Sequence, residues 1–393
     1  MHIRPLGTAA SGDGLVRQQV EVTYADGAVE ALWIAVPEGF AASAAGDAWA
    51  VAMLPLGMTL GEDIHLALPV CPVLHRNLGR LQALWRSWYP HLGTVRLEAP
   101  VAGPAPPGHG EALFFSGGVD SAYALAMVVE AGGTAPDLLI ALGADLGITH
   151  HDVFAQLQAR YAPMAARYGS RLVPLAANLR KTRWARANWL QLSFGPFLVA
   201  CHHALAARAA TVTLASGENP ELWPLGAHPG ADSFLSTATT SVRHGEQASR
   251  SAKLRALGRH PALLAGLRVC WRIRDGHNCG TCEKCVRTMV AAELAGVLRG
   301  CRLFPTQELS PLLVRRTLIP PGRTLTSYYL SCWEPLAEEA DQQGRSALAA
   351  AIRAAGARSQ RLNRVWETVQ PLHRHPVVWR VPALVDRIRR GGA

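Results

Sequence analysis

The sequence predicts an α/β fold built on a parallel β-sheet that helices cover on both faces. Between residues 111 and about 298, short apolar runs alternate with segments of helical periodicity. This order is typical of parallel sheets, because successive parallel strands need a crossover connection between them. The 393 residues are 49% hydrophobic and 17% charged, which indicates an ordered globular protein with a sizeable core.

The N-terminal part predicts a small β-containing domain. Apolar residues alternate over 17–36 around Asp26-Gly27, which indicates a β-hairpin whose tight turn is that pair. Spaced Leu and Trp residues over 74–92 indicate a helix. The segment 99–110 is rich in Pro and Gly, so it favours neither a helix nor a central strand, and we expect a domain boundary there.

The rest of the chain predicts a catalytic domain followed by helices. Strands and helices are expected alternately at 112–115, 121–131, 137–143, 152–168, 171–176, 188–208 and 210–216. Beyond 298 the pattern is helical with Pro interruptions. We therefore expect an accessory domain at 1–105, an α/β domain at 106–298 and a helical, arginine-rich region at 299–393.

The net charge of +10 is concentrated near the C-terminus. Nine arginines stand from Arg353 onward against only two acidic residues, Glu367 and Asp386. Such a region can contact nucleic acid, but a solvated helix face or an oligomer contact, as in a homodimer, is the simpler interpretation.

Several function classes are excluded by what the sequence lacks. The only lysines are Lys181, Lys253 and Lys284, and none follows a Gly, so a Walker A loop and its kinase or GTPase chemistry are absent. The sequence has neither a signal-peptide pattern nor a stretch of about 18 apolar residues. We expect a cytoplasmic protein with no membrane contact.

The most informative segment joins a strand to a helix through Ser-Gly-Gly-Val-Asp-Ser at 116–121. Gly117 and Gly118 let backbone N–H groups approach an anion closely, and the helix that follows adds unsatisfied N–H groups. Ser116 and Ser121 can donate hydrogen bonds to phosphate oxygens. Asp120 would repel a bare phosphate, so it indicates either bound Mg²⁺ or a helix cap. An ordinary strand-to-helix turn explains the glycines but not the residues around them.

A second pattern consists of four cysteines spaced C-x8-C-x2-C-x2-C, at Cys270, Cys279, Cys282 and Cys285. Four thiolates at such spacing indicate a closed structural Zn²⁺ site, with Gly280 permitting the sharp turn. Disulfides are disfavoured without a signal peptide. The isolated cysteines are expected to be small core residues: Cys71, Cys201, Cys301 and Cys332.

The loop at 116–121 resembles the signature of the N-type ATP pyrophosphatases, or PP-loop enzymes. Together with the cysteines it resembles the 7-cyano-7-deazaguanine synthase family. The segment Asp-Leu-Gly-Ile-Thr-His at 145–150 is similar to that family's D-Y-G-Q-[RK]-H motif. The resemblance covers about 111–295. It implies a doubly wound parallel sheet of the adenine-nucleotide α-hydrolase type.

The resemblance also implies roles for individual residues. Residues Ser116, Gly117, Gly118, Val119, Asp120 and Ser121 would bind ATP and Mg²⁺, and the four cysteines would bind Zn²⁺. Asp120, Asp145 and His150 would be catalytic. In the family, the loop holds the β,γ-pyrophosphate while a substrate oxygen attacks the α-phosphorus, and a nitrogen nucleophile then resolves the adenylated intermediate.

The chain departs from the family where the acceptor is recognised. The segment 217–232 lacks the Cys-Arg pair of the family's G-Y-P-D-C-R motif, so the acceptor, a small molecule or a group on a macromolecule, need not be a deazapurine. The candidate substrate groups are Glu218, Asn219, His228, Asp232, His244, Arg250 and Lys253, of which Arg250 and Lys253 are proposed as catalytic. The pair His202-His203 is better explained as a satisfied interior or surface pair.

We therefore expect an ATP-dependent ligase or synthase that adenylates a carboxylate or amide oxygen and transfers ammonia or an amine. Two alternatives stay open. A sulfur donor would make it a thiolating enzyme acting on a nucleobase-like or RNA substrate, with Cys201 as the isolated cysteine inside the catalytic domain. In a different class, the chain would be a nucleotide-binding subunit of a defence or nucleic-acid-modification complex.

Overall fold

The computed structural model describes residues 1–12, 14–40, 42–103, 106–206, 209–218, 223–272 and 275–369. The chain divides into two compact units. The first comprises Met1–Ala248, Gly266–Arg268 and Arg274–Gly276. The second comprises Ser249–Ala265, Val269–Ile273 and His277–Ala393.

The first unit is an α/β structure with one large, mostly parallel sheet, so the predicted class is confirmed at this level. Across the described residues the strand order is β10-β9-β6-β7-β8-β3-β2-β1-β4-β5. The five strands at one end of this order are all parallel to one another: β6 (Glu111–Phe114), β7 (Asp137–Leu142), β8 (Leu172–Ala177), β9 (Thr211–Leu214) and β10 (Ser241–His244). Their near-continuous apolar sequences suit strands that are buried on both faces.

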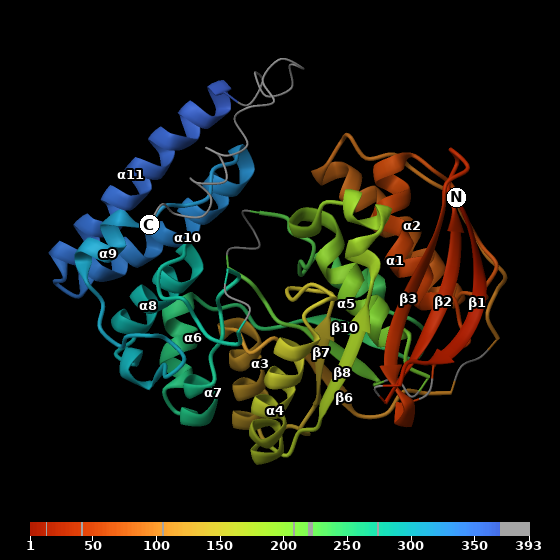
Figure 1. Cartoon of the computed structure of the whole chain (residues 1–393), viewed down its shortest axis with the longest axis horizontal. Coiled ribbons are helices and arrows are strands. Elements are labelled where there is room, and N and C mark those ends of the chain that lie inside the picture. Colours follow the sequence, from red (N-terminus) through yellow and green to blue (C-terminus); the bar gives the residue numbers. More distant parts are fainter. Residues whose placement is uncertain are drawn as a thin grey trace. The chain divides into compact units, whose positions relative to one another are not determined.

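The N-terminal strands extend this sheet. The antiparallel strands β1 (His2–Ala10), β2 (Leu15–Thr23) and β3 (Val29–Pro37) are drawn in red at the right of Figure 1. The expected hairpin is β2 and β3. The short strands β4 (Ile64–Leu66) and β5 (Leu97–Glu98) continue the sheet beyond β1.

The pairing of β3 with β8 joins the expected accessory domain to the parallel sheet. Ile34 aligns with Ala177 in an antiparallel register, and side chains from both parts share one buried apolar cluster. The limits of the two units therefore differ from the domain limits expected at 105 and 298, because the strands before and after the Pro- and Gly-rich segment hydrogen-bond within one sheet.

Five α-helices of the first unit pack on the sheet or on one another: α1 (Asp47–Leu60), α2 (Pro72–Trp88), α3 (Val119–Glu130), α4 (His151–Arg167) and α5 (Phe194–His203). α3 packs against β6, α4 against β7 and β8, and α5 against β8, β9 and α1. The expected helix over 188–208 is shorter than predicted, since a π-helical turn at Trp189–Ser193 precedes α5 and the helix ends at His203. Short 3-10 turns occur at Glu38–Phe40, Leu179–Lys181, Arg183–Arg186 and Asp232–Leu235.

The second unit is helical in the residues that the structure describes, as the sequence beyond 298 predicts. Its helices are α6 (Arg250–Leu257), α7 (Pro261–Ala265), α8 (Glu283–Leu294), α9 (Pro311–Arg316), α10 (Arg323–Gln342) and α11 (Ser346–Val369), with a 3-10 turn at Leu298–Gly300. α10 packs against α8 and α11, and α9 packs against α11. Among the described helices of the whole chain, none combines the length and the apolar character needed to cross a bilayer.

Candidate functional site

The strand order of the parallel sheet places the loop at 116–121 at a distinctive position. β6 has β7 on one side and β9 on the other, so the chain leaves β6 in one direction and later returns to its opposite flank. In open α/β sheets, ligands bind outside the carboxyl ends of the strands where the strand order reverses in this way. The loop follows β6 directly and therefore lies at that reversal.

The loop is closed by its own two serines. The Ser121 hydroxyl accepts from the Ser116 N–H at 3.3 Å and donates to the Gly118 carbonyl at 3.2 Å. The Ser116 hydroxyl accepts from the Gly118 N–H at 3.3 Å. Ser116 is exposed, whereas Ser121 is buried. Ser121 therefore shapes the loop, and Ser116 is the hydroxyl that solvent or a ligand can reach.

α3 begins at this loop without a capping side chain. Gly118 is its N-cap residue and, within the described chain, no side-chain hydrogen bond caps it. Val119 is buried and Asp120 is half-buried in the first turn. The amino end of α3 thus has no side-chain cap among the described residues and presents the positive end of the helix dipole, which favours an anion.

A tyrosine from α4 packs closely against Gly117. The φ of Gly117 is +75°, and a Cβ atom there would stand 1.9 Å from the hydroxyl oxygen of Tyr161. Tyr161 is fully buried, and burial raises its pKa to about 12. Its hydroxyl donates to the Gly266 carbonyl at 3.3 Å. Sequence reasoning missed this residue: the i, i+3, i+4 pattern of α4 indicates that Tyr161 faces inward but not that it contacts Gly117.

A separate chain segment borders the same loop. The backbone N–H of Arg268 donates to the Gly117 carbonyl at 2.8 Å. Arg268 is 9% exposed. This arginine was not among the expected site residues, because 151 positions of sequence separate it from Gly117 and no local motif marks it.

The loop after β7 carries the expected residues Asp145 and His150. Gly143, with φ +99°, lies where a Cβ atom would stand 2.0 Å from the Ala177 carbonyl oxygen. Asp145 is exposed. His150 precedes α4, and its Nδ1 lies 3.0 Å from the Gly147 carbonyl oxygen. Because β6 and β7 are adjacent and parallel, both residues lie on the same edge of the sheet as the loop at 116–121.

An arginine after β8 connects two of these loops. The Arg180 guanidinium donates to the Ala144 carbonyl and stacks over Trp189 at 4.1 Å. Burial lowers the pKa of Arg180, and the negative charge of Asp145 opposes that shift. Arg180 was not among the expected site residues either, yet it brings a positive charge to the edge of the sheet where Asp145 lies.

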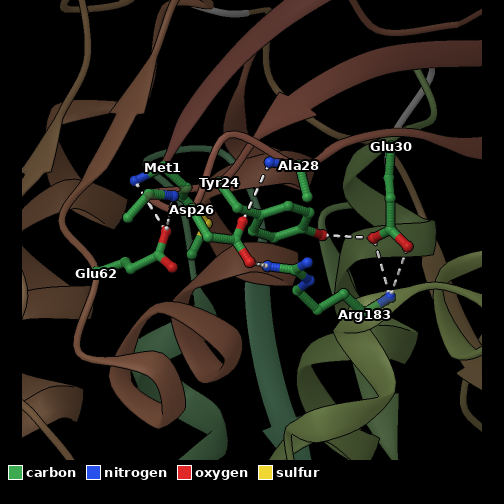
Figure 2. A network of polar contacts seen from close by, with 8 residues as sticks. Met1, Tyr24, Asp26, Ala28, Glu30, Glu62 and Arg183 are labelled. Carbon is green, nitrogen blue, oxygen red and sulfur yellow. Dashed lines mark hydrogen bonds and ion pairs between the residues drawn. The ribbon is translucent and has the colours of Figure 1, made fainter.

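The next residues after β8 are held by the β2–β3 hairpin (Figure 2). The Arg183 guanidinium pairs with Asp26 at 2.8 Å and lies over the Tyr24 ring at 4.3 Å. The backbone N–H of Arg183 donates to Glu30 at 2.9 Å, and the Tyr24 hydroxyl donates to the same carboxylate at 2.8 Å. Burial raises the pKa of Tyr24. The N-terminal hairpin thus fixes the position of the segment that follows β8. Figure 2 also shows the contact of Met1 with Glu62 and that of Ala28 with Asp26.

A buried carboxylate–histidine pair lies at the end of β10. His244 Nδ1 is 2.7 Å from an Asp232 carboxylate oxygen, and the other oxygen accepts from the His228 N–H at 2.9 Å. Burial raises the pKa of Asp232, while the hydrogen bond to His244 lowers it. The buried Nε2 of His244 has no hydrogen-bond partner among the described residues.

The remaining substrate candidates are placed as follows. Glu218 is buried just beyond β9. Asn219 lies outside the described residues. Arg250 and Lys253 are buried on α6 in the second unit, so their participation in the site of the first unit stays a prediction. His202 and His203 are fully buried, and His203 Nε2 lies 2.9 Å from the Leu235 carbonyl oxygen, as expected for an interior pair.

The second unit contains a candidate metal centre. The sulfur atoms of Cys270, Cys279, Cys282 and Cys285 all lie within 4.8 Å of one another. The Cys270–Cys282 and Cys279–Cys285 pairs are 3.9 and 3.8 Å apart. A tetrahedral ion with Zn–S bonds of about 2.3 Å requires S···S edges of about 3.8 Å. The four residues can therefore hold a metal ion such as zinc.

Backbone groups around the cluster suit thiolate ligands. The Cys279 sulfur accepts from the N–H groups of Thr281 and Cys282 at 3.4 and 3.2 Å. Cys282 is the N-cap of α8, where the helix dipole also favours negative charge. The expected turn at Gly280 is present, with φ +69°.

No family model matches the chain, and neither the curated proteins nor the solved structures contain a significantly similar one.

Proposed function

We propose that the first unit is an adenylating enzyme of the PP-loop type, with a doubly wound sheet that binds ATP at the carboxyl end of β6. The observation that carries the proposal is the position of the Ser-Gly-Gly-Val-Asp-Ser loop, at the point where the strand order reverses and at the amino end of α3, which no described side chain caps. The sequence resemblance to the 7-cyano-7-deazaguanine synthase family points to the same chemistry.

The two loop glycines support this proposal in different ways. A Cβ atom on Gly117 would collide with Tyr161, so Gly117 is required by the fold. A Cβ atom on Gly118 would approach no described atom closer than 3.3 Å. That atom is the hydroxyl oxygen of Ser116, a short polar side chain of the same loop, so we propose that Gly118 serves the approach of a phosphate to the N–H groups at the start of α3.

In the proposed reaction, a carboxylate or amide oxygen of the acceptor attacks the α-phosphorus, and pyrophosphate leaves toward the loop. Asp120 would hold Mg²⁺, which would supply neutralising charge. An ammonia or amine nitrogen then attacks the activated carbon, forms the new C–N bond and displaces AMP with its electron pair. Asp145 and His150 lie on the adjacent strand end, where a proton acceptor for that nitrogen is needed.

The thiolation alternative is less well supported. Cys201 is completely buried in α5, and burial raises the pKa of its thiol. A sulfur-transfer nucleophile must instead be a reachable thiolate. The nucleotide-binding subunit is the remaining alternative, and it predicts no pyrophosphate release.

The test is ATP–pyrophosphate exchange. We expect Asp120→Ala and Gly118→Val to abolish exchange, the first by removing the metal link and the second by filling the space beside the helix end. Asp152→Ala is the matched control, because Asp152 is an exposed acid in the first turn of α4. Full exchange in both loop variants, or none in the wild-type protein with any candidate acceptor, would refute the proposal.

The bond that is cleaved distinguishes adenylation from a nucleotide switch. With a competent acceptor, the products should be AMP and pyrophosphate in equal amounts. An ¹⁸O label in the acceptor oxygen should appear in AMP, because AMP leaves with the atom that nitrogen replaces. Formation of ADP, or of unlabelled AMP, would contradict the mechanism.

A further inference from the structure

We propose that Arg268 binds the terminal phosphates of the nucleotide and stabilises pyrophosphate as it leaves. This inference rests on the proposed function and names a residue that the loop motif does not contain. It would make Arg268 a catalytic residue in the strict sense, because its guanidinium would touch the departing group.

The first line of support is position. The Arg268 N–H donates to the Gly117 carbonyl at 2.8 Å, and Tyr161, which fills the space behind Gly117, donates to Gly266. The segment Gly266–Arg268 belongs to the first unit although the residues on either side of it belong to the second. The backbone that carries Arg268 is therefore attached to the middle of the phosphate loop.

The second line of support is charge. The positive charges of Arg268 and Arg160 lower the pKa of Tyr161 against the larger effect of burial. Arg160 also donates to the Gly276 carbonyl, whereas Arg268 is attached to the loop itself. A buried guanidinium acts through a low local dielectric, where its attraction for an anion is strong.

The third line of support is a chemical requirement. The loop 116–121 contains Asp120 and no basic residue, yet pyrophosphate gains negative charge as its bond to the α-phosphorus breaks. Phosphoryl-transfer sites supply fixed cations for such charge. Arginine suits this task because its planar set of N–H donors matches phosphate oxygens in pairs.

The experiment measures binding of inorganic pyrophosphate, and separately of AMP, to the full-length protein by calorimetry with Mg²⁺ present. We expect Arg268→Met to weaken pyrophosphate binding at least tenfold and to leave AMP binding within twofold. Arg268→Lys keeps the charge but not the paired donors, so it should lie between Arg268→Met and the wild type. Arg167→Met is the control, because it removes the same charge from the exposed last turn of α4.

The outcomes separate this inference from the proposed function. If the wild-type protein binds pyrophosphate and Arg268→Met binds it equally well, the inference is wrong while the PP-loop proposal stands. If the wild-type protein binds neither pyrophosphate nor AMP, both fail. Equal losses for pyrophosphate and AMP in Arg268→Met would reduce Arg268 to a structural role. If Arg268→Met does not fold, Arg268→Lys decides, since unchanged pyrophosphate affinity in that variant would overturn the requirement for paired donors.

Discussion

At the scale of single residues, the loop at 116–121 places two glycines with different surroundings at neighbouring positions. Gly117 adopts a left-handed backbone conformation and leaves room for the Tyr161 hydroxyl. Gly118 adopts an ordinary extended conformation, with φ −80° and ψ 170°. Gly117 is therefore required by the fold, whereas Gly118, on our proposal, is required for ligand binding.

The conformation of Gly117 and its closeness to Tyr161 predict that an alanine substitution there lowers stability. Gly117→Ala should cost roughly 1 to 2 kcal/mol for its backbone conformation and about 1 to 3 kcal/mol more for the clash with Tyr161. Gly132→Ala is the matched control: Gly132, just beyond α3, has φ +66° and no atom within 4 Å of its Cβ position, so only the backbone cost applies. Urea unfolding measures both variants, and equal losses of stability would contradict the role of Tyr161.

Tyr161 also predicts a dependence of stability on alkaline pH. Burial raises the pKa of its phenol to about 12 in the folded protein, whereas the unfolded chain loses that proton near its ordinary pKa of about 10. The folded state therefore holds more protons between these values, so the contribution is complete below about pH 10 and is lost as the pH rises toward 12. At most it changes by about 1.4 kcal/mol per pH unit.

Tyr161→Phe removes this titration. Between pH 9 and pH 11, we expect the free energy of unfolding of this variant to fall by about 1 kcal/mol less than that of the wild-type protein. Urea unfolding at both pH values provides the measurement. Identical pH dependence in the two proteins would show that the phenol is not held in its protonated form.

At the scale of elements, the sequence predicts the bounds of helices and strands best where the local hydrophobic pattern matches the burial of the element. β6 to β9 and α3 and α4 lie within a few residues of their predicted bounds, because each apolar run or helical period matches its burial. α1 was missed, since every residue from Asp47 to Met58 is buried and a helix that is apolar all round shows no period. β1 was missed because Pro5 and Gly7 interrupt its alternation, and the register shifts between them.

The candidate sites, like the helices and strands, are predictable only where a local sequence pattern marks them. The four cysteines, and likewise the residues of the loop at 116–121, are contiguous or closely spaced in sequence, so their spacing alone predicts the two candidate sites. The contacts of Tyr161 and Arg268 with Gly117, and that of Asp232 with His244, depend on how distant segments pack. No pattern within one segment can encode such contacts.

The cysteine cluster predicts that metal and folding are coupled in the second unit. Purified protein should contain one Zn²⁺ per chain, and Cys282→Ser should lose the metal and lower the melting temperature, because binding free energy contributes to folding. Elemental analysis and thermal unfolding measure the two effects. Cys301→Ala is the control, since Cys301 is a buried cysteine of the same unit outside the cluster and its loss should leave the zinc content unchanged. Metal-free protein of normal stability would exclude the site.

At the scale of the whole molecule, the positive charge is distributed unevenly between the two units. Of the nine arginines from Arg353 onward, the structure describes those up to Arg364, and they are exposed along α11. The opposite side of α11 is buried, including Ile352, Ala355 and Ser359. Only one of these arginines, Arg353, has an ion pair in the described part of the chain, with Asp341. The helix therefore packs through one face and presents a strip of cationic side chains on the other.

This strip allows a sharper test of nucleic-acid binding than truncation at Arg353, which would also remove the buried face of α11. If this strip contacts nucleic acid, the intact protein will bind single-stranded RNA at low salt, and Arg358→Gln, Arg361→Gln and Arg364→Gln combined will weaken that binding. If all three arginines contact phosphates, the slope of log K against log salt should become shallower by about 2, since each contact contributes roughly 0.7.

ATP–pyrophosphate exchange should not change, because the substitutions lie in the other unit. Filter binding across a salt series gives the slope, and Arg167→Gln is a control that removes one exposed arginine from the first unit. Absence of RNA binding at low salt would leave the strip as a solvated helix face, which is the simpler of the two interpretations that the sequence allows.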